Sequence, residues 1–248
     1  MNMQSNIQPI SNVPALFILD KKILVVADLH IGIESELSEH GLHTNSQTKK
    51  MVDRLLFLLE KYNPSDVVLL GDIKHTIPSS TIMERRDIRK FFETIKSFGI
   101  IHVVPGNHDG NISKLAPDDV LVHSSDGFVI NNIGFVHGHR WPKIEIMQCD
   151  QVIFGHTHPT IMLTDRLGFQ SFEPCWLRGS FNKDKLLERY SISNNPDFIM
   201  MPAFNPLCGG SALNKDGIVG PFSNIIDVDS CQVYLLDGSS LGIVKDIQ

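Results

Sequence analysis

The first half of this chain alternates short, fully apolar runs with amphipathic segments of helical period. Three of the runs are bounded by turn residues and are typical of buried strands: ILVVAD (23–28), DVVLLGD (66–72) and IIHVVPGN (100–107). Two helical segments, residues 46–62 and 80–98, separate them and carry apolar side chains on one face. This strand–helix–strand order predicts parallel strands with helices packed against them.

The remaining strands follow one another more closely. Two apolar runs split by Lys21 and Lys22 predict a first hairpin, and short strand-like runs succeed each other after about residue 120. One further helix is expected at 183–190. Either one mixed sheet, or two sheets packed face to face with helices outside, accommodates both halves.

The chain shows no low-complexity linker and no internal repeat. We therefore expect one domain over residues 1–248, with a C-terminal elaboration over about 165–248. Within that elaboration, residues 165–222 are rich in Pro, Gly and Asn, which predicts mainly loops.

Metal-binding side chains follow five of the predicted strands. At these strand ends the chain reads Asp28-Leu29-His30, Gly71-Asp72, Asn107-His108-Asp109, His137-Gly138-His139 and His156-Thr157-His158. The carboxyl ends of strands in α/β sheets converge on one edge, where ligand sites are built. Each motif alone is ordinary turn chemistry, since Asp, Asn and Gly are common at loop starts. Together they contain six of the eleven histidines and predict a metal site at that edge.

The donor types indicate which ions the site binds. Imidazoles, carboxylates and one amide oxygen, with no thiolate among them, suit Mn, Fe, Zn and similar divalent ions. Seven candidate ligands exceed what one tetrahedral ion needs and fit two ions that share a carboxylate. Two ions ~3.5–4 Å apart stabilise the attacking and the leaving oxygen in a displacement at phosphorus, with a hydroxide between them as the expected nucleophile. The pattern predicts phosphoester hydrolysis.

Composition narrows the partners and the compartment. The net charge of −6 provides no basic face for tight, sequence-independent nucleic-acid binding. The four cysteines, Cys149, Cys175, Cys208 and Cys231, form no Cys-x-x-Cys pair, so we interpret them as buried thiols. The first fifteen residues lack a secretory pattern, and no apolar run approaches the ~18 residues of a membrane span. We expect a cytoplasmic protein without membrane contact.

Taken in order, the motifs DLH, GD, GNHD, HGH and GHTH resemble those of the calcineurin-like metallophosphoesterase superfamily. They cover residues 28 to 158 in the family's order and with family-like gaps, and as a set they are highly specific. The resemblance implies an α/β fold: a four-layer αββα sandwich of two mixed β-sheets flanked by helices, with a dinuclear metal site at strand carboxyl ends. It also implies two divalent ions per chain, with manganese expected first and Fe, Zn, Co or Ni as alternatives.

The resemblance assigns roles residue by residue. The first ion is expected on Asp28, His30 and His158, the second on Asn107, His137 and His156, with Asp72 bridging both. His108 is expected beside the substrate phosphate as a general acid or phosphate-stabilising group, with Asp109 orienting its ring. His137 is preferred over His139 as a ligand because the family's single histidine directly follows the strand. His139 and Arg140 then either contact the substrate phosphate or have structural roles.

Later segments narrow the match to a subgroup. The runs GDIKH (71–75), EPCWLRG (173–179) and PAFNP (202–206), followed by Gly209-Gly210, resemble DNA-ligase-associated phosphoesterases and their archaeal relatives, which are related to double-strand-break-repair nuclease subunits. This implies a phosphodiesterase or nuclease acting on DNA or RNA, with a DNA-repair protein as a further partner. Many relatives have a second Asp where this chain has His75. His75 either reaches the metals or a substrate phosphate, or bonds to backbone at a helix start.

Four residues of the subgroup segments are candidates for substrate contact. Arg178 and Asn205, together with Trp176 and Phe204, form either a lid or a base-stacking platform near the site, because aromatic and arginine side chains suit nucleic acids. The alternative for the two aromatic residues is burial in a sheet core.

Three functions compete on these observations. The first is phosphodiester hydrolysis on nucleic acid, and the second is hydrolysis of phosphomonoesters or nucleotide-linked pyrophosphates, which the acidic net charge fits at least as well. The third is a non-catalytic scaffold with the same fold. Inactive members of the superfamily typically lack the GNHD histidine or some ligands, whereas His108 and all seven ligand positions are present here. We therefore predict an enzyme.

Overall fold

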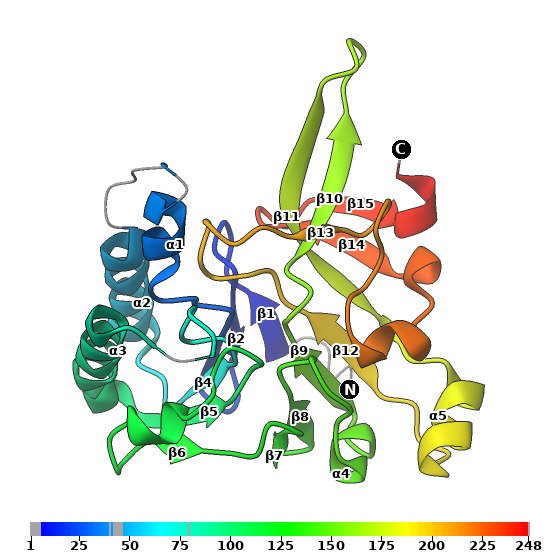
Figure 1. Ribbon diagram of the computed structural model, residues 1–248. Helices are drawn as coiled ribbons and strands as arrows, with labels where there is room; N and C mark the ends of the chain where they lie inside the picture. The colour runs from blue at the N-terminus through cyan, green and yellow to red at the C-terminus, as the bar shows by residue number, and fades with distance from the viewer. Residues whose placement is uncertain (1–5, 40, 42–46, 79, 248) are drawn as a thin grey trace.

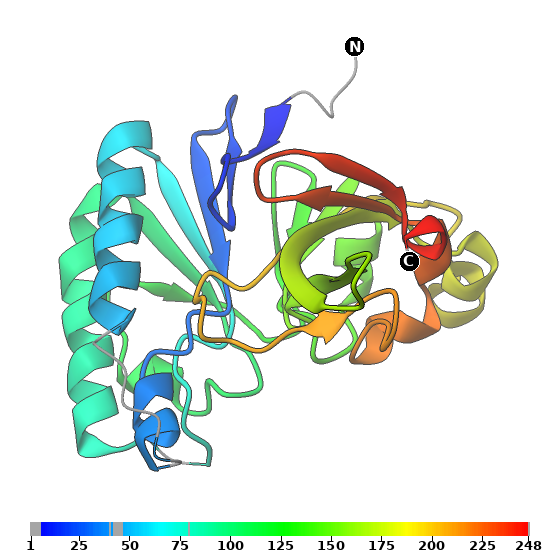
Figure 2. The same ribbon diagram turned by 90° about the horizontal axis from the view of Figure 1, so that it is seen from above.

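The computed structural model describes residues 6–39, 41, 47–78 and 80–247, and they form four layers (Figures 1 and 2). Two β-sheets face each other. Helices α2 (Gln47–Tyr62) and α3 (Ile82–Ile95) cover the outer face of the first sheet, and α5 (Lys183–Tyr190) packs on the outer face of the second. The four-layer αββα sandwich of two mixed sheets is thus confirmed.

The first sheet has the strand order β1-β2-β3-β4-β5-β6. Its strands are β1 (Ile7–Pro9), β2 (Ala15–Ile18), β3 (Ile23–Ala27), β4 (Asp66–Leu70), β5 (Ile100–Val104) and β6 (Leu121–Val122). The predicted hairpin is the antiparallel pair β2–β3, and β3 to β6 run parallel. The parallel strands predicted from the alternating pattern are therefore confirmed.

Burial on both faces explains why the strands of the first sheet are continuous apolar runs. Along β3, Leu24 and Val26 pack in the outer cluster with Leu55 of α2, whereas Val25 packs between the two sheets with Ile153. All five residues of β3 are buried. A strand covered on both faces has no polar side to show, and the sequence therefore lacks the alternation of a half-exposed strand.

The second sheet has the order β13-β10-β11-β12-β9-β8-β7, with β14 paired to β11 and β15 to β14. Its strands are β7 (Phe128–Ile130), β8 (Ile133–Phe135), β9 (Gln151–Phe154), β10 (Pro159–Thr164), β11 (Gln170–Ser180), β12 (Asp197–Met200), β13 (Ser211–Ala212), β14 (Gln232–Leu235) and β15 (Ser240–Ile243). Strand β11 pairs with β10, β12 and β14. The loop-rich segment 165–222 contains the expected helix at 183–190, but the prediction of mainly loops missed β11, a central strand of the sheet.

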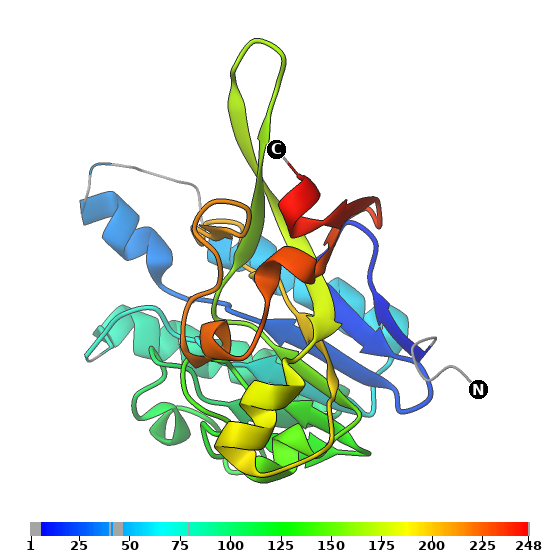
Figure 3. The same ribbon diagram turned by 90° about the vertical axis from the view of Figure 1, so that its right-hand side faces the viewer.

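The long hairpin of β10 and β11 explains why the sequence pattern did not predict strand β11. The outer parts of β10 and β11 project away from the body of the molecule (Figures 1 and 3), and Leu167 and Phe169 at the tip are 82% and 72% exposed. Only the inner part of β11, around Trp176, is fully buried. A strand that leaves the core after a few residues carries polar and apolar side chains without a clear period.

Two short helices were not predicted, α1 (Ile33–Glu39) and α4 (Ile144–Met147).

Trp176 and Phe204 are both fully buried, Trp176 between the sheets and Phe204 under the helices of the first sheet, so the core alternative for them is confirmed. Among the residues that the structure describes, none of the helices combines the length and the apolar character needed to cross a bilayer.

Candidate metal centre

Asp28 lies where loops from the two sheets meet. The loops after β3 and β4 come from the first sheet, and those after β8 and β9 come from the second. Oδ1 of Asp28 lies 2.9 Å from Nε2 of His137 and 3.3 Å from Nε2 of His158. The backbone N–H of His156 donates to Asp28 Oδ2 at 3.1 Å. The Asp28 side chain is completely buried. Residues more than a hundred positions apart in the sequence are thus brought into one polar cluster between the sheets.

Asp72 occupies the middle of this cluster. Its Oδ2 lies 3.6 Å from Nε2 of His30 and 3.6 Å from Nε2 of His137. Among the described residues, four groups of three side chains have their candidate ligand atoms within 4.8 Å of one another, and two of these groups contain Asp72: Asp28, His30 and Asp72, and Asp72, His137 and His156. Asp72 belongs to both groups, which is the arrangement expected of a shared carboxylate.

The backbone at these positions is unusual. Five of the residues have positive φ, a region that side chains other than glycine rarely adopt: Asp28 (57°), His30 (43°), Asp72 (47°), His156 (71°) and His158 (47°). Each such conformation costs on the order of 1–3 kcal/mol and is maintained by its surroundings. Part of the support is the pairing of neighbouring loops, in which the N–H of His30 donates to the carbonyl of Asp72 at 2.7 Å. Strain concentrated at five polar residues of one cluster indicates a functional site.

Glycines let the loops approach one another closely. A Cβ atom added to Gly71 would lie within 3 Å of the His137 ring, and one on Gly155 within 3 Å of Asp28 Oδ2. Gly71 also has a φ of 71°. The glycine in the motifs GD and GHTH is therefore required by the packing of the opposite loop.

The donor atoms fit divalent metal ions. Nδ1 of His158 donates to the carbonyl of Gly209 at 2.8 Å, and Nδ1 of His30 lies 3.1 Å from Nδ1 of His75, so the Nε2 atoms of both rings face the carboxylates. These two Nε2 atoms are buried and, among the described residues, have no hydrogen-bond partner. A metal-binding histidine usually has its other ring nitrogen bonded in this way.

The electrostatics of the cluster also favour cations. Burial opposes ionisation of Asp28, but His158 and His137 outweigh it and hold the pKa of Asp28 well below its usual range. Burial lowers the pKa of His158, but the Asp28 carboxylate outweighs it and raises it to about 9. Burial, opposed by His137 and assisted by Asp28, raises the pKa of Asp72. The buried carboxylates of Asp28 and Asp72 repel each other, so positive charge between them would stabilise both.

The third loop of the first sheet, after β5, brings His108 to the cluster. The backbone N–H of His108 donates to Asp72 Oδ1 at 2.8 Å, and its Nδ1 donates to the backbone carbonyl of His75. The His108 ring lies edge-on to the His30 ring, with 4.9 Å between their centroids. Asn107, which precedes it in this loop, is exposed. His108 is therefore next to the cluster, on its open side.

Asp109 has a different position from the expected one. Its buried carboxylate accepts the backbone N–H groups of Lys74 (3.1 Å) and Gly106 (2.9 Å). Burial, and then the charge of Asp72, raise its pKa to about 6. The expected contact between Asp109 and the ring of His108 does not occur, because the His75 carbonyl takes that place. Asp109 instead joins the loops that follow β4 and β5.

His75 reaches the cluster through other side chains. Besides its contact with His30, its Nε2 lies 2.6 Å from Oε2 of Glu36 on α1, and its ring stacks on that of His108 with 5.6 Å between centroids. The alternative that His75 only bonds to backbone is therefore wrong. Glu36 was missed because α1 carries no sequence signal that ties it to the strand-end motifs.

The two residues after His137 behave differently from each other. Nδ1 of His139 lies 3.0 Å from Nδ1 of His137. The other ring nitrogen of His137, Nε2, faces the carboxylates. Burial, and then the charges of His137 and His156, lower the pKa of His139 to about 3. Arg140 is exposed and donates to the Ser125 hydroxyl at 2.9 Å. This geometry agrees with the preference for His137 over His139 as a ligand.

Arg178 and Asn205 lie in different surroundings. Arg178 pairs with Ile199 of β12, which pairs with Ile153 of β9. Its side chain lines a cavity of about 290 Å³ together with Gln151 and Asp197. Asn205 is only 1% exposed, and its amide donates to the carbonyl of Leu29 at 2.8 Å. Asn205 is thus a buried link between loops, and the cavity beside Arg178 contains none of the cluster residues. Substrate contact by Arg178 stays a prediction.

The interpretation of all four cysteines as buried thiols missed the position of Cys208 beside the cluster. Its Sγ and the ring nitrogens of His30 and His158 all lie within 4.8 Å of one another. The residue is partly exposed, unlike Cys149, Cys175 and Cys231, which are buried. The flanking run of 202–206 and Gly209-Gly210 does not tie Cys208 to the strand-end motifs, so only the folded chain reveals its position.

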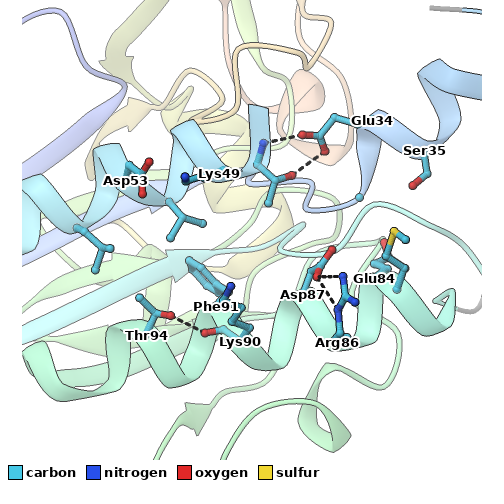
Figure 4. A pocket seen from close by; sticks show the side chains of 15 residues that line it. Glu34, Ser35, Lys49, Asp53, Glu84, Arg86, Asp87, Lys90, Phe91 and Thr94 are labelled. Carbon is cyan, nitrogen blue, oxygen red and sulfur yellow. Dashed lines mark hydrogen bonds and ion pairs between the residues drawn. The ribbon is translucent and has the colours of Figure 1, made fainter. Parts of the chain in front are cut away.

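A separate groove of about 590 Å³ lies on the outer layer between α1, α2 and α3 (Figure 4). Its walls mix acidic residues such as Asp53 and Asp87 with the basic residues Arg86 and Lys90, and Arg86 pairs with Asp87. It contains none of the predicted site residues. The groove is therefore distinct from the cluster and lacks the single-sign charge of a nucleic-acid channel.

Comparison with known proteins agrees with the fold and with the motifs. A family model described as calcineurin-like phosphoesterase matches residues 21–160, more than half of the 248 residues. Pseudomonas putida nuclease MPE has a similar structure, with a TM-score of 0.56 and 19% identity over 93% of this chain and 96% of that one. Yfce, a phosphoesterase from E. coli, gives a TM-score of 0.40 and 13% identity over 89% and 96%. Because the matched segment contains all five strand-end motifs, the chain belongs to the calcineurin-like phosphoesterase family.

Proposed function

We propose that this protein is a divalent-metal-dependent phosphodiesterase that cleaves nucleic acid. The observation that carries the metal dependence is the cluster itself: buried Asp28 and Asp72 face His30 and His158, whose Nε2 atoms are buried without a hydrogen-bond partner among the described residues. Asp28, His30 and His158 would hold one ion, and Asn107, His137 and His156 the other, with Asp72 shared. Manganese is the first candidate, with Fe, Zn, Co and Ni as alternatives, since nitrogen and oxygen donors suit all of them.

When bound, a pair of divalent ions supplies activated water at neutral pH and neutralises charge on the phosphate. The residues around the cluster would stabilise the phosphate and protonate the leaving oxygen. Nδ1 of His108 is occupied by the His75 carbonyl, so Nε2 is the atom left to stabilise the phosphate or to give a proton to the leaving oxygen. Asp109 would fix the loop that carries His108 through its bonds to the backbone of Lys74 and Gly106.

Two observations support nucleic acid as the substrate. The segments 71–75, 173–179 and 202–210 resemble those of DNA-ligase-associated phosphoesterases and their archaeal relatives. The fold is shared with P. putida nuclease MPE over nearly the whole of both chains. On this proposal a DNA-repair protein is a natural partner, and the site of action is the cytoplasm.

The net charge of −6 favours a second candidate, hydrolysis of phosphomonoesters or nucleotide-linked pyrophosphates. An acidic protein repels a polyanion more strongly than a small phosphate compound. Phosphodiester cleavage remains the primary proposal because of the subgroup resemblance.

The test is an activity screen with defined metals. Full-length protein supplied with Mn, Fe, Co or Zn is assayed on a chromogenic bis-aryl phosphate, single-stranded DNA, cyclic nucleotides and nucleotide monophosphates. We expect the diesters to be cleaved, and Asp72→Asn to reduce cleavage to background. Asp53→Asn, on the exposed face of α2, is the matched control and should retain activity.

Each contrary result has a distinct meaning. Wild-type activity no higher than that of Asp72→Asn with every metal refutes an enzymatic function. Preference for monophosphates supports the second candidate. Fewer than one bound ion per chain after addition of manganese, iron, cobalt or zinc in turn favours a non-catalytic scaffold.

A further inference from the structure

The loop between β12 and β13 is held against the cluster on both sides of Cys208. Before it, the N–H of Phe204 donates to the carbonyl of Ala27 at 2.8 Å, and Asn205 bonds to the carbonyl of Leu29. After it, the carbonyl of Gly209 accepts Nδ1 of His158 at 2.8 Å. The loop is therefore fixed to both ligand loops, those of Asp28–His30 and of His156–His158.

Close packing leaves this loop little freedom. The N–H of Cys208 donates to the carbonyl of Asn205 at 3.1 Å, which closes a turn. A Cβ atom on Gly210 would lie within 3 Å of the carbonyl oxygen of His158. The Cys208 side chain is thus presented from a supported turn, and its Sγ lies 3.9 Å from the backbone carbonyl oxygen of Asp28.

The atoms that surround the sulfur are open to a ligand. Nε2 of His30 is buried in a side chain that is only 5% exposed, and it has no hydrogen-bond partner among the described residues. Nε2 of His158 is likewise buried and makes no hydrogen bond within the described part of the chain, although it lies 3.3 Å from Asp28 Oδ1. Sγ of Cys208 completes a group of three with these rings, all within 4.8 Å of one another. Two unpartnered nitrogens and a sulfur at this separation match the donor set of a small metal ion.

We propose that Cys208 is a thiolate ligand of the ion that Asp28, His30 and His158 hold, and that it shifts the preference of this site from manganese toward zinc, iron and cobalt. The proposal rests on the metal-dependent function proposed above. On binding, the sulfur–metal bond replaces the S–H bond, and the released proton passes to solvent. Thiolate ligands favour these softer ions, whereas carboxylate-rich and water-rich sites suit manganese.

The test is a cobalt titration of the metal-free, full-length protein. A thiolate bound to Co²⁺ gives a strong charge-transfer band in the near ultraviolet, which imidazole and carboxylate ligands do not. We expect this band in the wild type and its loss in Cys208→Ser and Cys208→Ala, with cobalt still bound. Cys149→Ser is the matched control, because Cys149 is buried away from the cluster and its Sγ donates to the carbonyl of Glu145. That variant should retain the band.

A second readout is the competition between metals. Zinc affinity should fall by roughly tenfold or more in Cys208→Ser, since the loss of even a supporting partner of a ligand costs about 10–100-fold. Manganese affinity should fall less, so the ratio of the two affinities changes. Circular dichroism and thermal unfolding of the metal-free variants establish that they are folded.

The outcomes separate this proposal from the proposed function. Cobalt bound to the wild type without the charge-transfer band, or a band that persists in Cys208→Ser, overturns the role of Cys208 and leaves the metal-dependent function intact. An unchanged zinc-to-manganese affinity ratio also overturns it. Failure of the wild type to bind any of these ions overturns both.

Discussion

Nδ1 of His30 and Nδ1 of His75 lie 3.1 Å apart, and the far nitrogen of His75 is bonded to the carboxylate of Glu36. The carboxylate only accepts, so it fixes a proton on Nε2 of His75 and leaves Nδ1 as an acceptor. His30 must then carry its proton on Nδ1, which leaves the Nε2 lone pair directed at Asp28 and Asp72. Glu36 and His75 thus select the tautomer of His30 that a metal ion requires.

Substitutions that break the contacts from Glu36 through His75 to His30 should weaken metal binding. We expect His75→Ala, and to a smaller extent Glu36→Ala, to lower the affinity of the first ion by about 10–100-fold, because the His30 ring loses the partner that sets its tautomer. Isothermal titration of metal-free protein measures the change. Glu60→Ala, at an exposed position on α2, is the control for loss of an acidic helix residue. Equal affinities in all these proteins would refute the tautomer argument.

His139 should support His137 in the same manner. Its ring contacts the nitrogen of His137 that faces away from the carboxylates, so we expect His139→Ala to reduce the affinity of the second ion by roughly tenfold. Arg140→Ala should leave metal affinity unchanged, since Arg140 is exposed and bonded to Ser125. If His139 instead acts on substrate alone, the variant will bind metal normally and show only a higher KM.

Gly71→Ala should destabilise the protein and disturb His137. The substitution combines a strained φ of 71° with a clash against the His137 ring, and overpacking of this kind costs about 1–3 kcal/mol beyond the strain. Gly168→Ala is a matched control, because φ there is 87° and no atom lies within 4 Å of the added Cβ. Urea unfolding of the two variants isolates the clash. Similar losses of stability in both would show that strain alone matters at Gly71.

A histidine outside the metal cluster should contribute to acid sensitivity. Burial, and then the charges of His102 and Lys143, lower the pKa of His123 from 6.5 to about 4. Between these pH values the unfolded chain binds a proton that the folded chain does not, so the free energy of unfolding falls as pH falls from 6.5 toward 4. His123→Phe can still stack on Phe128 and removes the titration. Its stability should fall less steeply than that of the wild type over this range, whereas parallel pH curves would contradict the assignment.

The elements around the site were predictable where a local pattern coincides with burial. The helical period of 46–62 corresponds to α2, and the run 66–72 to β4, because one face or both faces of these segments lie in the core. The strand-end motifs were equally visible, since parallel strands must bring their carboxyl ends to one edge.

Other features depend on contacts that no local pattern encodes. Cys208 reaches the cluster only because Phe204 and Asn205 bond to the loop of Asp28, far away in the sequence. The surroundings of Arg178 were not predictable because the eleven-residue strand β11 was not foreseen. Aromatic and arginine content alone could not locate these side chains.

The cluster draws its side chains from both sheets, with Asp28, His30 and Asp72 from the first and His137, His156 and His158 from the second. Ions held there would act as a cross-link between two layers of the sandwich, joining positions as far apart as Asp28 and His158, 130 residues along the chain. A link of that span closes a long loop and restricts the unfolded chain strongly. Bound metal would therefore stabilise the fold as well as supply chemistry, and its removal would lower the free energy of unfolding.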